Sequence, residues 1–198
     1  LTALVARFGE QAVAAFGAGT RIEAMSMIVI FALTSALSPY MAQNLGAKNF
    51  ARAKQALILS LRFTLIFQLC VYIIMALAAP ALATIFSEDP LVINLIQQYL
   101  YIILLGSIFY TLVIVINTAF NSAKQANKTL WLTLTRVFLC LAPCAWLGGE
   151  LWGYQGLLGG TVIGNALACL VAWRMLNNSL NLMEKAMKNS QLLLKIVK

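Results

Sequence analysis

The chain has 198 residues, of which 62% are hydrophobic and only 10% are charged, and its mean hydropathy is +0.86. Soluble domains are roughly 45–50% apolar and about 25% charged, so this composition excludes an ordinary water-soluble protein and predicts an all-α integral membrane protein. The formal net charge is +8. The basic residues lie between hydrophobic spans rather than on one polar face, so nucleic acid is not an expected partner.

Five hydrophobic spans follow one another, and each is long enough to cross a bilayer core, which takes roughly 20 helical residues. Four of them contain no charged residue, and the fourth in chain order contains Arg136 near its middle. The spans cover residues 24–47, 63–87, 90–123, about 129–148, and 151–173.

The two ends of the chain differ from the spans. The chain begins with Leu1, and the first eight residues, LTALVARF, resemble the end of an earlier helix. We therefore expect a fragment of a longer protein, with five transmembrane helices plus the end of a sixth in a domain over residues 1–177. Residues 178–198 form a basic tail in which Leu and Met alternate with Lys, a pattern that weakly favours an amphipathic helix on the inner leaflet.

Charges on the connections predict the orientation of the chain. Basic connections alternate with acidic or balanced ones, which is the positive-inside pattern. This pattern places the C-terminus in the cytoplasm and predicts a multi-pass protein of the inner, or plasma, membrane. The expected cytoplasmic connections are 43–54 and 121–128, and the expected external ones are 7–12, 86–91 and 148–153.

Local signals mark several helix ends and bends. Gly46 ends the first span, Asn49 is a candidate N-cap, and Pro90 suits the first turn of its helix. Pro39 and Pro143 lie farther inside their spans, where each is expected to kink its helix. A structural bend alone accounts for these prolines at least as well as a functional hinge does.

Small residues recur in the last span. They predict a smooth helical face for close packing against a neighbour. The four cysteines lie inside apolar spans, and there is no histidine and no CxxC pair, so we interpret them as packing residues and expect no metal site. The small residues are Gly156, Gly160, Gly164, Ala168 and Ala172, and the cysteines are Cys70, Cys140, Cys144 and Cys169.

Two charges, Arg21 and Glu23, lie within the first predicted helix in the stretch GTRIE. If the helix begins near Ala12, Glu23 lies roughly 16 Å along it. The two residues are i,i+2, so they point to different faces and need separate partners. An ionisable group at that depth costs at least about 2.5–3 kcal/mol to insert. Glu23 is therefore a candidate proton or cation site, and an interhelical salt bridge is the equally weighted alternative.

Other polar residues within the spans are weaker candidates. Tyr110 and Asn117 are seven apart and share a helical face, which suits either a polar cavity or a bond to a neighbouring helix. Arg136 is expected to bond helix-end carbonyls or a buried partner, with a structural role favoured over a transport role. Arg62 can reach the inner interface and receives no function.

Several stretches in the same order resemble the C-terminal half of a multidrug and toxic compound extrusion (MATE) transporter. The resemblance covers about residues 1–177 and depends on the order and spacing of the stretches together. They are GEQAVAAFGAGTRIE, AQNLGAKNFARAKQA, APALATIFSEDPLV, NTAFNSAKQANKTL, the Arg136-to-Pro143 spacing, and GYQGLLGGTVIGN.

The resemblance implies one lobe of a two-lobe (6+6) secondary transporter, comprising the end of helix seven and helices eight to twelve. Such proteins export cationic or amphipathic drugs in exchange for Na⁺ or H⁺, with a cavity between the lobes. It implies membrane lipid, a drug substrate and a missing N-terminal lobe as partners. It implies no cofactor beyond the coupling ion. The helix-ten segment, 91–123, lacks the internal acid that one branch of the family uses, so the coupling site stays unassigned.

Three other functions remain as alternatives. A lipid-linked oligosaccharide flippase of the same superfamily should show more cationic residues in its cavity than Arg21 and Arg136. A non-transporting structural membrane subunit should purify with a stable partner. An enzyme would need convergent His, Asp, Glu or Cys groups near one interface, and the sequence offers one acid within its spans, so we expect no catalytic residues.

Overall fold

Helices make up almost all of the computed structural model, which describes the backbone of residues 2–196 and the side chains of residues 2–183. The all-α prediction is therefore confirmed for the described chain. The elements are α1 (Thr2–Val5), the 3₁₀ turn η1 (Ala6–Phe8), α2 (Glu10–Gly46), α3 (Phe50–Phe86), α4 (Pro90–Ser122), α5 (Ala126–Leu134), the π-helical segment η2 (Thr135–Leu141), and α6 (Ala142–Ile196).

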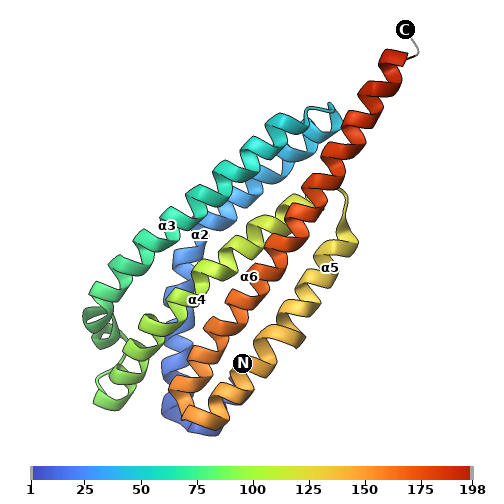
Figure 1. Cartoon of the computed structure of the whole chain (residues 1–198). Helices are drawn as coiled ribbons and strands as arrows, with labels where there is room; N and C mark the ends of the chain where they lie inside the picture. The colour runs from blue at the N-terminus through green and yellow to red at the C-terminus, as the bar shows by residue number, and fades with distance from the viewer. Residues whose placement is uncertain (1, 197–198) are drawn as a thin grey trace.

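Four helical segments of the described chain are long and apolar enough to cross a membrane: α2, α3, α4 and the joined segment Ala126–Met183. That last segment contains 58 residues, which as one straight helix would reach about 87 Å, far beyond a bilayer core of about 30 Å. The backbone leaves helical geometry at Trp152 and at Gly153, where φ is 62°. The chain reverses there (Figure 1), so the segment has two limbs. The number of crossings, five, remains a prediction.

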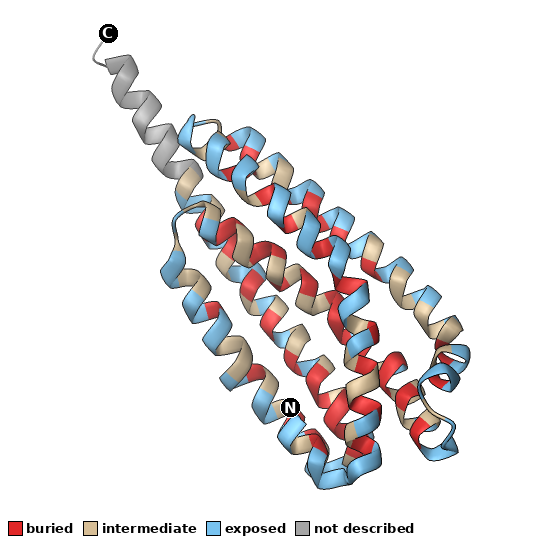
Figure 2. Cartoon of the chain, turned by 180° about the vertical axis from the view of Figure 1, so that it is seen from behind, coloured by how far each residue is buried: buried red, intermediate tan, exposed pale blue. Residues whose placement is uncertain are grey.

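Helix α4 is the central element of the bundle. It packs against α2, α3, α5 and α6, and buried side chains occur along its whole length (Figure 2). Tyr99 and Leu100 anchor one apolar core cluster, and Ile116 and Phe120 anchor the other. Large apolar side chains on α3 point outward, including Leu77, which is 80% exposed. An apolar outer surface is what a lipid-facing helix requires.

The small-residue face of α6 packs as the sequence predicts. A Cβ at Gly156 would meet the backbone of Gly148, and one at Gly160 would meet the carbonyl of Cys144. The second limb of α6 therefore lies directly on the backbone of the first limb, at a separation that only small residues allow. The free cysteines Cys140 and Cys144 lie along this contact.

The connections separate into two sets at opposite ends of the bundle. Arg7 forms a 2.8 Å ion pair with Glu150, and Gln11 donates a 3.2 Å hydrogen bond to Asp89. These contacts join all three connections that the charge pattern assigns to the outside. At the other end, Ser179 donates a 2.8 Å hydrogen bond to Gln125. The grouping agrees with the predicted alternation, and which end faces the cytoplasm remains a prediction.

The predicted helix starts agree with the structure. Asn49 caps α3 by accepting a hydrogen bond from the Arg52 amide, and Asp89 caps α4 by accepting one from the Leu91 amide, with Pro90 in the first turn. Both side chains satisfy amides that a helix start leaves without carbonyl partners.

The ends of α2 and α4 share one turn geometry. Lys48 and Lys124 follow the two helices with φ of 58° and 57°. Each donates its amide to the carbonyl three positions back, and the next residue donates to the carbonyl five positions back. This is the Schellman arrangement, in which glycine usually occupies the left-handed position. Lysine there costs about 1–2 kcal/mol of backbone strain.

The two interior prolines lie in different surroundings. α2 continues as one helix through Pro39. Pro143 follows the π-helical segment Thr135–Leu141 directly. A proline ring clashes with the carbonyl four residues earlier, here that of Leu139. The wider π turn is one of the recognised ways in which a helix changes course. The hinge role of either proline remains a prediction. The backbone of α6 also continues past the predicted boundary at residue 177, and the side chains of 184–198 lie outside the described residues.

Candidate functional site

Glu23 lies inside the bundle and has a specific partner on another helix. The Tyr99 hydroxyl of α4 donates a 2.7 Å hydrogen bond to Glu23 Oε2. Glu23 is half-buried, whereas Tyr99 is only 1% exposed. The carboxyl group therefore opens to its surroundings on one side and is held from the core on the other. Hydrogen bonds to charged acceptors are roughly twice as strong as neutral ones, so this contact orients Glu23.

Small and aromatic neighbours fix the position of Tyr99. A Cβ at Gly19, one turn before Glu23, would meet the Tyr99 ring. Phe16 packs edge-on against the same ring at a centroid distance of 5.4 Å. Tyr154 of α6 belongs to the same buried core cluster as Tyr99, and its buried hydroxyl has no hydrogen-bond partner among the described residues. The hydroxyl of Tyr99 is thus directed at Glu23 by packing on several sides.

Arg136 joins three segments of the bundle. Its guanidinium lies 3.7 Å from the centroid of the Tyr110 ring on α4, within the range of a cation–π contact. Its Nε donates a 3.2 Å hydrogen bond to Asn165 Oδ1 on α6. Arg136 itself belongs to the π-helical segment, a type of distortion that is frequent at functional sites. Of the two expectations for Arg136, helix-end carbonyls or a buried partner, the structure contains side-chain partners, Tyr110 and Asn165, and both are only half-buried.

The two polar groups are neighbours in the electrostatic sense. Glu23 and Arg136 attract each other, although no salt bridge joins them among the described side chains. Low dielectric surroundings strengthen such an interaction.

Two predicted site residues lie apart from these contacts. Arg21 is exposed on α2 and, in the described part of the chain, has no hydrogen bond or ion pair. It points to a different face from Glu23, as their spacing requires. Asn117 shares the α4 face with Tyr110, but its Oδ1 is buried without a partner among the described side chains. The structure therefore groups Glu23 and Tyr99, and separately Arg136 and Tyr110, within one polar region.

Sequence reasoning missed two residues of this region, Tyr99 and Asn165, and also a buried polar pair on α3 that no described contact links to it. Tyr99 and Asn165 carry no charge, and nothing in their local sequence distinguishes them from packing residues. On α3, Thr64 and Gln68 share a helical face, and their side-chain polar atoms are buried without partners in the described structure. A polar pair at i,i+4 inside an apolar span was the available signal, because uncompensated burial of polar groups is costly.

The chemistry open to this arrangement is binding rather than bond making. A carboxyl group, a guanidinium and three tyrosine rings can hold a proton, a cation or an aromatic, charged organic molecule. No group of three or more His, Cys, Asp or Glu side chains in the described residues is placed to hold a metal ion.

Comparisons with known proteins place the chain in a family. The MatE family profile matches residues 1–147. A protein of Shewanella oneidensis named "FAD transporter" is 42% identical over 167 residues, which cover 84% of this chain and 37% of that protein. The chain thus spans little more than a third of that relative.

Solved structures of MATE transporters also match this chain. The Vibrio cholerae MATE transporter VcmN in its bent form is 28% identical, with a TM-score of 0.88, and the match covers 92% of this chain and 42% of VcmN. An outward-facing multidrug resistance MATE transporter of the MOP superfamily has a TM-score of 0.87 at 20% identity, covering 93% and 42%. That second likeness concerns the fold alone. From the length and identity of these matches, the chain belongs to the MATE family of membrane transporters.

Proposed function

We propose that the chain forms one lobe, residues 1–177, of a secondary transporter that moves an organic substrate across the inner membrane in exchange for Na⁺ or H⁺. The transported molecule would lie between this lobe and a facing one, which makes the N-terminal lobe a required partner. Glu23, held by Tyr99, is the proposed coupling group, because it combines a part-buried hydrogen bond to another helix with a side chain that is only half-buried.

For the substrate, we propose an anionic aromatic molecule of the flavin nucleotide class. The Arg136–Tyr110 contact is the observation that supports it most, because it offers a guanidinium and an aromatic ring in one place. Guanidinium groups suit phosphate oxygens, and aromatic rings suit a planar heterocycle. The name of the Shewanella oneidensis relative points in the same direction.

Export of cationic or amphipathic drugs is the second candidate. Glu23 favours it, because a carboxyl within the bundle can attract a positively charged substrate. An oligosaccharide flippase and a non-transporting subunit are weaker alternatives. The first needs more cationic residues than Arg21 and Arg136, and the second gives no reason for a hydrogen bond between Glu23 and Tyr99 inside the bundle.

Transport in everted membrane vesicles separates these candidates. The protein, expressed from its native reading frame, is assayed for accumulation of FAD and, in parallel, of the cationic dye ethidium, with an imposed Na⁺ or pH gradient. We expect FAD accumulation that unlabelled FAD competes away and ethidium does not. Accumulation of ethidium alone would support the drug exporter and contradict the flavin nucleotide proposal. Accumulation of neither compound in vesicles that contain folded protein would contradict both.

A further inference from the structure

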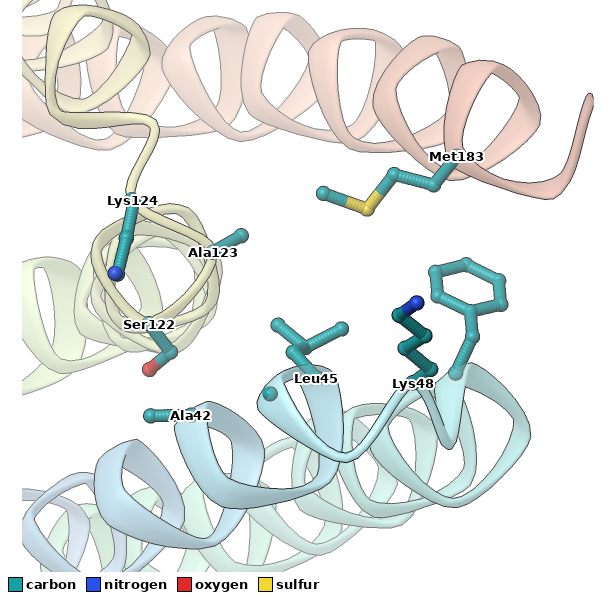
Figure 3. Close-up of a pocket in the computed structure, with 9 residues that line it drawn as sticks. Ala42, Leu45, Lys48, Ser122, Ala123, Lys124 and Met183 are labelled. Atoms are coloured by element: carbon teal, nitrogen blue, oxygen red, sulfur yellow. The ribbon is translucent and has the colours of Figure 1, made fainter. Parts of the chain in front are cut away.

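A pocket of about 520 Å³ lies at the end of the bundle where α2, α4 and the second limb of α6 meet. Apolar atoms of Leu45, Phe50 and Met183 line it together with two lysines, Lys48 and Lys124. In Figure 3 the two lysines stand on opposite sides of the pocket, with Leu45 between them. The transport region around Glu23 and Arg136 contributes no residue to this pocket.

Both lysines occupy the left-handed position of a Schellman turn, with φ of 58° and 57°. Glycine takes this position without strain, whereas a lysine side chain does not. Attraction to the helix dipole explains a basic residue near a helix end. It does not explain this position, because a lysine one turn earlier would be attracted without strain. Two lysines in the left-handed position thus line one and the same pocket.

The location defines the kind of ligand. The pocket lies at the ends of helical segments that are long and apolar enough to cross a membrane, and the end of such a segment is where lipid headgroups are expected. Basic pockets between transmembrane helices are suited to anionic headgroups, and each lysine near the surface contributes about 1 kcal/mol to such attraction. The apolar lining beneath the lysines suits the start of an acyl chain.

We propose that this pocket binds one anionic phospholipid, with the headgroup phosphate between Lys48 and Lys124 and an acyl chain along Leu45, Phe50 and Met183. The proposal requires only that this end of the bundle lies at a membrane surface. It does not depend on the identity of the transported substrate.

Native mass spectrometry of the detergent-solubilised protein, titrated with phosphatidylglycerol or phosphatidylcholine, tests this directly. The double variant Lys48→Gln/Lys124→Gln keeps side chains of similar length and similar backbone strain but removes both charges. We expect it to weaken phosphatidylglycerol binding by at least about tenfold and to leave phosphatidylcholine binding unchanged. The matched control Arg62→Gln/Arg174→Gln removes two exposed charges that do not line the pocket and should bind like the wild type. Equal binding by the wild type and the lysine variant, or equal losses in both double variants, would overturn the proposal.

A second variant guards against a folding defect. Lys48→Gly/Lys124→Gly removes the charges and also relieves the left-handed strain, so the lipid-free protein should melt at a higher temperature while phosphatidylglycerol binding falls. A lower melting temperature would show that the lysines are not held under strain. Competition with soluble glycerol phosphate distinguishes a lipid site from a site for free phosphate. If it displaces phosphatidylglycerol at equal concentration, the site recognises free phosphate and the lipid assignment is wrong.

Discussion

The Tyr99 hydroxyl donates a 2.7 Å hydrogen bond to the carboxyl group of Glu23, 76 positions earlier in the chain. The bond ties α4, the central helix, to the only acid within the predicted bilayer portion of α2. Because Tyr99 is almost completely buried, its hydroxyl group cannot form a replacement hydrogen bond with solvent when the bond to Glu23 is lost. The strength of this contact is therefore measurable through Tyr99.

Removing that hydroxyl should destabilise the protein. Tyr99→Phe deletes one hydrogen bond and leaves a carboxyl oxygen of Glu23 without its donor, and we expect a loss of roughly 1–3 kcal/mol in the free energy of unfolding. Tyr101→Phe is the control, because Tyr101 is exposed on the same helix. Thermal melting of both variants in detergent gives the comparison. Equal melting temperatures for the two variants would mean that the Glu23 contact contributes nothing.

Adding one methyl group at Gly19 should disturb the same contact by crowding. A Cβ there would meet the Tyr99 ring, whereas a Cβ at Gly17 meets nothing within 4 Å. We expect Gly19→Ala to cost about 1–3 kcal/mol through overpacking. Gly17→Ala should be neutral or stabilising by up to about 1 kcal/mol, since alanine is the better helix former. The difference in melting temperature between these variants checks the prediction, and identical shifts would contradict the packing described around Tyr99.

Much of the fold follows from the sequence, whereas the partners within it do not. Uncharged runs locate the long helices, and Asn49 and Pro90 mark two helix starts because capping is a local property. The glycine face predicts close packing because the spacing itself builds the surface. Tyr99 and Asn165 were not predictable, because each acquires its role from a residue on another helix. The π-helical turn around Arg136 was missed for a related reason. Pro143 signals a disturbance, but the tertiary contacts decide its form.

A second pair of glycines, Gly159 and Gly160, tests the packing of the two α6 limbs. A Cβ at Gly160 would meet the backbone of Cys144, which cannot move aside easily, and a Cβ at Gly159 meets nothing within 4 Å. Gly160→Ala should therefore separate the limbs and lower the yield of folded protein, at a cost of about 1–3 kcal/mol or more. Gly159→Ala should fold like the wild type. Size-exclusion profiles and melting curves measure both, and a well-folded Gly160→Ala protein would argue against this limb contact.

The guanidinium shape of Arg136 should matter as well as its charge. Arg136→Lys keeps the positive charge but loses the planar group that stacks on Tyr110 and the Nε donor to Asn165. A cation–π contact away from water contributes about 1–2 kcal/mol, so we expect Arg136→Lys to reduce substrate binding or transport roughly tenfold. Arg174→Lys is the exposed control. Substrate dissociation constants and transport rates are measured for both variants. Full activity of Arg136→Lys would show that the positive charge is sufficient and that the guanidinium shape is not required.

The ion pair between Arg7 and Glu150, at the end of the bundle opposite the Lys48–Lys124 pocket, should contribute little to the free energy of unfolding. Arg7 and Glu150 have side chains 58% and 48% exposed, so solvent and salt screen their 2.8 Å contact. We expect Glu150→Gln to change the free energy of unfolding by no more than about 1 kcal/mol. Melting curves at low and high salt measure the effect. A large loss that persists at high salt would show that this contact closes its end of the bundle more firmly than its exposure indicates.

Gradient-driven accumulation by Glu23→Gln protein tests the central claim most directly. Wild-type and variant protein, each expressed from the native reading frame and shown to melt alike, are reconstituted in vesicles with an imposed Na⁺ or pH gradient, and FAD and ethidium accumulation is followed. If Glu23 is the coupling group, the wild type accumulates its substrate against a concentration gradient, and the variant only equilibrates it. Accumulation by Glu23→Gln at the wild-type rate and extent would contradict the assignment and place coupling elsewhere in the transporter.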